Sequence, residues 1–213
     1  KNSTFNYSYS LNSTAISRVE SYRYLGAVIT DKLNWPERIT KLAAETSKTL
    51  GFIKRSLSLF PSSIRKLAYE LYIRPKLEYA KATWSPRQQY LIESLESIQN
   101  RATRFICSEY DRQVSVSAIK SSINLESLAH RRKISRLCLF QNLYYNRPDL
   151  KTFLLVPPVR TSRRLFNSTG STNAFNKTFL LLAIEEWNSI PEPVVHERDN
   201  SKFRQLTSAH FAK

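Results

Sequence analysis

The clearest structural signal in the sequence lies in residues 61–107, PSSIRKLAYELYIRPKLEYAKATWSPRQQYLIESLESIQNRATRFIC. In its second half, apolar side chains recur at the three- and four-residue spacing of a helix buried along one stripe: Leu91, Leu95, Ile98, Ala102 and Phe105. Its first half carries a similar stripe of Ile64, Leu67, Ala68 and Leu71. Because proline lacks an N–H and disfavours helical geometry in the residue before it, we expect Pro75 to bend or end the first helix near Arg74. The stretch therefore predicts two amphipathic helices joined by a turn at Trp84-Ser85-Pro86.

Most of the remaining chain predicts further helices. Residues 36–57 carry one apolar stripe, in which Gly51 should weaken the helix or end it early. Residues 126–145 predict another long helix, and residues 175–190 predict a last one that Pro191 closes. Residues 146–174 are rich in Ser, Thr, Asn, Arg and Pro and predict a loop, whereas the tail from Glu192 has little pattern apart from a possible turn at 203–206.

Residues 5–30 differ from this helical part of the chain. Aromatic and β-branched residues alternate there with polar ones, Asn12-Ser13 supplies a turn signal, and Gly26 interrupts the second apolar run. We expect two or three short antiparallel strands, which need a helix or a sheet to pack on. The predicted fold class is therefore mainly α, with a small antiparallel β segment at the N-terminus, a helical bundle and further C-terminal helices.

Composition and charge narrow the class of protein. The 213 residues include 33 Lys+Arg against 17 Asp+Glu, a net charge of +16 that favours a polyanionic partner through counterion release from phosphates. The hydrophobic fraction of 41% is enough for a core and argues against wholesale disorder. No apolar run approaches the roughly 20 residues that cross a bilayer, and no signal-peptide pattern opens the chain, so we expect neither membrane binding nor secretion. Cys107 and Cys138 fall on apolar helical faces and predict buried free thiols in a reducing compartment.

The sequence shows no complete active site. Its four aspartates are isolated, whereas two-metal phosphoryl transfer needs clustered carboxylates that hold two cations about 4 Å apart. Three histidines and two cysteines do not reach a zinc spacing, and neither a nucleophile elbow nor a glycine-rich phosphate loop is present. We therefore expect that the chain alone is not an enzyme and binds no metal, cofactor or small-molecule substrate.

Basic residues flank the apolar stripes of three expected helices. The residues concerned are Lys48, Lys54 and Arg55; Arg65, Lys66, Arg74 and Lys76; and Arg131, Arg132, Lys133 and Arg136. Each group alone is typical of a solvated surface, but together with the net charge they predict a basic face that could track a phosphate backbone. Tyr22, Tyr24, Trp35 and Trp84 could stack on bases or sugars, although aromatic residues near a helix–sheet junction more often belong to a core.

Several blocks follow one another in a recognisable order. They are SYRYLGAVI at residues 21–29 with Leu33-Asn34-Trp35, LGFIKR at 50–55, RPKLEYA at 74–80, Trp84-Ser85-Pro86, LESIQNRA at 95–102 and WNSIP at 187–191. This series resembles the region after the catalytic motif in reverse transcriptases of non-LTR (LINE-type, jockey-like) retrotransposons. It spans most of the chain, from Tyr22 to Pro191, and departs from the family's late Trp-Asn-x-Leu-Pro signature by carrying Ile190 in place of Leu.

The resemblance implies a position within a polymerase. Tyr24, Leu25 and Gly26 would lie near the primer grip, and the following helices would hold the template–primer duplex by its backbone. The implied partners are RNA, DNA and the rest of the palm and fingers, in the nucleus and in cytoplasmic ribonucleoprotein, and Mg²⁺ would belong to the catalytic palm of the full-length enzyme. The expected parts are the end of the palm (1–33), a thumb-like bundle (34–110), a helical region beyond the thumb (111–147), a loop or linker (148–174) and a C-terminal helix and tail (175–213).

The chain lacks the family's Tyr-x-Asp-Asp motif, so we expect a piece of a longer polymerase that cannot polymerise by itself. The fingers, the endonuclease and the C-terminal cysteine/histidine knuckle of some relatives are also missing from it. One alternative is a degenerate or co-opted transposon remnant that acts as a helical protein-interaction or generic nucleic-acid-binding domain. A free-standing basic DNA-binding protein would instead show sequence preference, for which no helix carries a base-reading signature.

Overall fold

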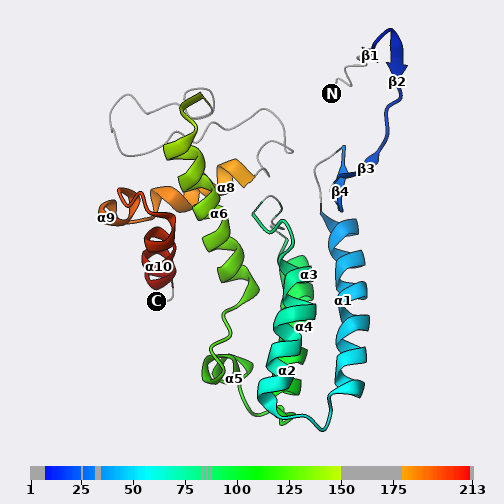
Figure 1. Cartoon of the computed structure of the whole chain (residues 1–213), viewed down its shortest axis with the longest axis vertical. Coiled ribbons are helices and arrows are strands. Elements are labelled where there is room, and N and C mark those ends of the chain that lie inside the picture. Colours follow the sequence, from blue (N-terminus) through cyan, green and yellow to red (C-terminus); the bar gives the residue numbers. More distant parts are fainter. Residues whose placement is uncertain are drawn as a thin grey trace.

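The computed structural model describes residues 8–24, 26–31, 35–82, 84, 86, 88–149 and 179–211. They form a mainly helical molecule with two small antiparallel sheets at the N-terminal end, which confirms the predicted fold class (Figure 1). The strands are β1 (Tyr9–Leu11), β2 (Thr14–Ile16), β3 (Ser21–Tyr24) and β4 (Ala27–Thr30). The helices are α1 (Pro36–Ser56), α2 (Ser62–Ala68), the π-helical turn η1 (Tyr69–Ile73), α3 (Arg74–Glu78), α4 (Gln89–Cys107), α5 (Val116–Ser122), α6 (Leu128–Asn146), α8 (Phe179–Asn188), α9 (Glu192–Val195) and α10 (Asn200–Phe211). In this described part of the chain, no helix is both long and apolar enough to cross a membrane.

Each small sheet is one hairpin. β1 pairs with β2, with Tyr9 opposite Ile16, and the expected turn at Asn12 and Ser13 is confirmed by their positive φ angles of 49° and 64°. β3 pairs with β4, with Ser21 opposite Thr30. Gly26 lies in the turn of this second hairpin with φ of 78°, a backbone conformation that glycine adopts without strain. The predicted start of the β segment, residues 5–7, lies outside the described residues.

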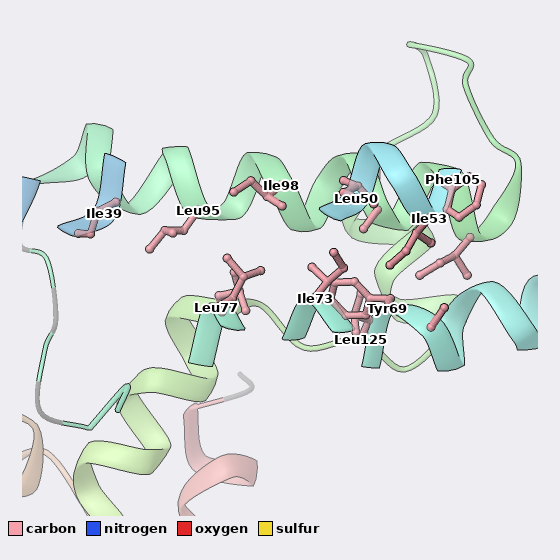
Figure 2. Close-up of a cluster of buried hydrophobic side chains, with 14 of the residues drawn as sticks. Ile39, Leu50, Ile53, Tyr69, Ile73, Leu77, Leu95, Ile98, Phe105 and Leu125 are labelled. Atoms are coloured by element: carbon pink, nitrogen blue, oxygen red, sulfur yellow. The ribbon is translucent and has the colours of Figure 1, made fainter. Parts of the chain in front are cut away.

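The first core joins α1, the α2–η1–α3 segment and α4, as the inward-pointing side chains in Figure 2 show. The stripe predicted for α4 is fully buried, with Leu95 and Ala102 at 0% exposure. α1 contributes Ile39, Leu50 and Ile53, and it continues through Gly51 to Ser56, so the expected early end is wrong. Burial of these side chains outweighs the intrinsic cost of about 1 kcal/mol for one glycine in a helix.

Of the stripe predicted on Ile64, Leu67, Ala68 and Leu71, only Ala68 faces the core. Ile64, Leu67 and Leu71 are exposed, and the first core instead receives a neighbouring set: Ala68, Tyr69, Ile73 and Leu77. Both sets are apolar and have helical spacing, so periodicity alone does not say which one points inward. The buried set includes the larger Tyr69 ring and the four-residue steps that continue through η1 to Leu77, so it fills the space between α1 and α4.

Pro75 does not end its helix near Arg74. The turn before it widens into η1, where the Arg74 N–H bonds to the Tyr69 carbonyl five residues earlier, and α3 then runs through Pro75 to Glu78. A π-helical turn removes the usual four-residue bond at the point where proline has no N–H to give and its ring would press on the preceding turn. The helical segment therefore extends about one turn further than the proline rule predicts.

A second core forms around α6, α8 and α10. Trp187 is its centre, with its ring centroid 5.1 Å from that of Phe140, 5.4 Å from Tyr144 and 5.7 Å from Phe203. α6 belongs to both cores, because Leu128 at its start packs in the first and Phe140 in the second. The C-terminal tail is helical, contrary to expectation: Asp199 accepts a bond from the Lys202 N–H at the start of α10, and this helix buries Phe203.

The two cysteine thiols differ in burial. Cys138 is buried and Cys107 is half-buried, and both are free. Residues 150–174 of the expected linker and residues 175–178 of the expected last helix lie outside the described residues.

Candidate nucleic-acid interface

The outer face of α1 carries an exposed row of cations. Lys41, Lys48 and Arg55 are seven residues apart and so lie on one side of the helix, opposite the buried Ile39 and about 10 Å from one to the next. Lys48 and Arg55 have no hydrogen-bond or ion-pair partner among the described residues, while Lys41 pairs with Glu37 at 2.6 Å. α1 forms one edge of the bundle in Figure 1, and Lys41, Lys48 and Arg55 are all exposed. Lys48 and Arg55 are therefore free to meet a polyanion, whereas Lys41 would exchange its bond to Glu37.

Two more cations widen this row on the side toward α4. Arg101 reaches across from α4 and donates to the Ser47 hydroxyl at 2.8 Å, which fixes its guanidinium beside α1. Partial burial lowers the pKa of Lys54, and the positive charge of Arg101 lowers it further. Two like charges therefore lie close together on this flank, an arrangement that an anion would stabilise.

On the other flank, a groove of about 560 Å³ runs between the second hairpin, α1 and α3. Its charged lining is mostly basic, with Arg23, Lys41 and Lys76 near a single carboxylate, Glu45. Lys76 is held in place by a 2.8 Å bond from its Nζ to the Thr49 hydroxyl. The groove thus continues the basic surface of α1 toward the hairpin.

Of the residues predicted to lie near the primer grip, Gly26 is the one that lines this groove in the described part of the chain. A Cβ at that position would make only ordinary van der Waals contact with the Tyr79 ring at 3.8 Å, so glycine is favoured there by its positive φ rather than by lack of space. Tyr24 is exposed on β3 and remains available for contact. Leu25 lies outside the described residues.

Arg65 and Lys66 instead hold the ends of other helices. Arg65 donates to the Phe105 carbonyl at 2.7 Å and to the Ser108 hydroxyl, where α4 ends. Lys66 donates to the Ile123 carbonyl at 2.7 Å, where α5 ends. Cations at these places satisfy carbonyl groups that have no partner within the helix.

The role of Arg65 can be tested by substitution. We expect Arg65→Gln to lower the free energy of unfolding by about 1–2 kcal/mol, because the bonds from Arg65 to the Phe60 and Phe105 carbonyls, each 2.7 Å long, are lost. Urea denaturation measures this change. Arg112→Gln, at an exposed position in the loop after α4, is the matched control and should have no effect. Equal stability of the two variants would contradict a structural role for Arg65.

The predicted cations of α3 and α6 are also engaged elsewhere. Arg74 pairs with Glu70 at 3.1 Å, and Arg131 binds Glu78 from α3 with two nitrogens. Lys133 lies over the Phe211 ring, with its Nζ 3.3 Å from the ring centroid.

Arg132 and Arg136 are buried, at 3% and 5% exposure, so their position does not support the predicted contact with a nucleic-acid backbone. Both belong to α6, and Arg132 lies over the same Trp84 ring as Arg38 of α1, so burial rather than distance separates them from the exposed row on α1. The structure therefore divides the predicted cations into an α1 group and an α6 group.

Sequence reasoning did not single out three members of the α1 surface: Arg23, Lys41 and Arg101. Lys41 could have been found from its seven-residue spacing to Lys48. Arg23 and Arg101 come from other elements, and only the packing brings them next to α1.

Comparison with models of protein families, with curated proteins and with solved structures finds no match for this chain.

Proposed function

We propose that this chain is the part of a non-LTR (LINE-type, jockey-like) retrotransposon reverse transcriptase that follows the catalytic motif, and that it grips the RNA template–DNA primer duplex as a thumb. The observation that carries the proposal is the exposed row of Lys41, Lys48 and Arg55 on a rigid helix at the edge of the bundle. Phosphate contacts of this kind position a duplex without reading its sequence. The groove beside Gly26 would receive the primer end.

The blocks behind the resemblance support the proposal by where they lie. Trp84 is buried in the first core, Trp187 is the centre of the second, and Gly26 lies at the hairpin turn. These positions build the scaffold, as expected of motifs that hold a thumb together rather than perform chemistry. Catalytic aspartates and Mg²⁺ would belong to the preceding palm. The palm and fingers would be protein partners, within nuclear and cytoplasmic ribonucleoprotein.

The second candidate function is a co-opted remnant that acts as a protein-interaction domain. An exposed apolar strip favours it, running from the end of α1 along α2 and η1: Leu59, Phe60, Ile64, Leu67 and Leu71. Leu59 is 97% exposed. The two candidates differ in whether the chain binds a heteroduplex in a salt-dependent manner.

The triple variant Lys48→Ala, Lys54→Ala, Arg55→Ala tests the proposed function. We expect weaker binding to an RNA–DNA hybrid and a plot of log K against log salt that is flatter by about 2–3, because up to three phosphate contacts are lost. Fluorescence anisotropy at several salt concentrations, with two unrelated hybrid sequences, measures both effects. The loss should be the same for both sequences.

A control variant with the same change in charge is Arg112→Ala, Arg147→Ala, Lys202→Ala, at exposed positions outside α1. It should bind as the parent chain does. If the slope of log K against log salt falls equally in both triple variants, binding depends on net charge alone, and the proposed face is wrong. If the parent chain does not bind the hybrid, the protein-interaction candidate takes its place.

A further inference from the structure

A second basic site lies away from α1, in a cavity of about 550 Å³ between α4, α6, α8 and the segment at Pro86. One wall is apolar, formed by Pro86, Ile92, Ala129 and Leu182. The other carries three cations from consecutive turns of α6: Arg132, Lys133 and Arg136. Neither α1 nor the groove beside the hairpin contributes to this lining.

Arg132 is a buried cation that lacks an anionic partner. Its Nε and Nη2 have no hydrogen-bond partner, and its guanidinium lies over the Trp84 ring at 5.3 Å from the centroid. Burial lowers its pKa to about 10, against the opposing effect of Glu96 and Glu78. Those carboxylates are engaged elsewhere, Glu96 with Lys120 at 3.1 Å and Glu78 with Arg131. A buried charge with unsatisfied N–H groups destabilises the folded chain, so an anion that bonds to Arg132 would stabilise it.

Two neighbouring cations, Arg136 and Lys133, add to the positive charge around Arg132. Arg136 lies four residues on, on the same side of α6, and its positive charge disfavours that of Arg132. Glu186 binds Nε of Arg136 at 2.8 Å and also Nη2, but leaves Nη1 without a partner. Lys133 contacts an aromatic ring and makes no ion pair with a described residue. One engaged carboxylate and the exposed Glu185 therefore face three cations.

No carboxylate of the described residues bonds to Nε or Nη2 of Arg132. All 17 aspartates and glutamates lie within the described residues, and of these only Glu185 and Glu186 line the cavity. The unpaired N–H groups of Arg132 are therefore left for an anion from outside the chain.

We propose that this cavity binds a nucleotide, with Arg132, Lys133 and Arg136 holding the phosphate and the apolar wall receiving the base. The volume lies within the range of small-molecule sites, and guanidinium groups suit the geometry of phosphate oxygens. The phosphate could belong to a free nucleotide or to one unit of a single strand. This site is separate from the duplex-binding face of α1 and does not depend on it.

Isothermal titration of the whole chain with adenosine monophosphate, adenosine, inorganic phosphate and a four-residue oligoadenylate tests the proposal. We expect adenosine monophosphate to bind more tightly than inorganic phosphate, and adenosine not to bind. Tighter binding of the oligoadenylate than of the mononucleotide would assign the site to a strand, and the reverse would assign it to a free nucleotide. Equal binding of adenosine and its monophosphate, or tighter binding of a hexaglutamate peptide, would overturn the proposal.

Two variants locate the binding. Arg132→Met should weaken the binding of adenosine monophosphate about tenfold or more, because it removes a phosphate-binding guanidinium. It should not lower the stability of the unliganded chain, because the charge that it removes is buried and has no anionic partner. Lys133→Gln should weaken binding by a smaller factor. The variant Lys48→Ala, Lys54→Ala, Arg55→Ala removes three charges from α1, more than either of these variants, and should bind the nucleotide normally. Unchanged binding to Lys133→Gln, combined with a large loss of stability in Arg132→Met, would assign Arg132 a purely structural role and overturn the proposal.

Discussion

Trp84→Ala is expected to lower the free energy of unfolding by about 3–5 kcal/mol. The Trp84 side chain is 1% exposed and donates from its Nε1 to the Tyr79 carbonyl at 2.7 Å. Two guanidinium groups, of Arg38 and Arg132, lie over its ring at 5.1 and 5.3 Å from the centroid. Removing the ring leaves a cavity and strips two buried cations of the aromatic face that stabilises them. Equilibrium denaturation in urea measures the loss.

Trp35→Ala is the matched control for this prediction. Trp35 packs against the same core but is only half-buried, so its loss should cost about 1–2 kcal/mol. Trp84→Phe keeps an aromatic face but loses the hydrogen bond to the Tyr79 carbonyl. Its free energy of unfolding should therefore lie between those of the parent and of Trp84→Ala. Equal losses for Trp35→Ala and Trp84→Ala would show that neither burial nor the two arginines distinguishes Trp84.

Trp84 also shows where sequence reasoning ends. The two interpretations of this residue, a base-stacking surface and a core, depend on whether its ring is accessible, and its spacing does not say. The apolar stripe of α4 was predicted correctly, because its polar residues leave only one face to bury. Residues 64–77 carry two overlapping apolar sets, and the choice between them depends on α1 and α4, which lie elsewhere in the sequence.

The candidate site divides in the same way. Lys48 and Arg55 could be predicted as exposed cations, because they lie opposite the apolar stripe of their own helix. Arg131 and Arg136 belong to an equally basic stretch, yet they pair with Glu78 and Glu186, 53 and 50 residues away. Net charge predicts that cations outnumber carboxylates, but only the packing of α6 against α3 and α8 decides which cations remain unpaired.

Glu78→Gln should lower the free energy of unfolding at pH 7 by about 2–3 kcal/mol. The carboxylate lies at the end of α3 and is 13% exposed. It accepts bonds from Nε and Nη2 of Arg131 in α6 and from Lys81 at 2.8 Å. Loss of its charge leaves Lys81 without this carboxylate and Arg131 with Glu126 alone, at 3.2 Å, and weakens the contact between the first core and α6.

This loss should depend on pH in a defined direction. Burial alone would raise the pKa of Glu78, but the hydrogen bonds and charges of Arg131 and Lys81 outweigh it and lower the pKa below its ordinary value. The unfolded chain therefore takes up this proton first, so the stabilisation is complete above about pH 4.3 and disappears as the pH falls through the lower pKa of the folded state. Urea denaturation of the parent and Glu78→Gln between pH 7 and pH 3 should give curves that converge at the acidic end. Glu93→Gln, at an exposed position on α4, should follow the parent throughout within about 0.5 kcal/mol. If the difference in the free energy of unfolding between the parent and Glu78→Gln stays constant down to pH 3, Glu78 does not stabilise the fold through its ion pairs with Arg131 and Lys81.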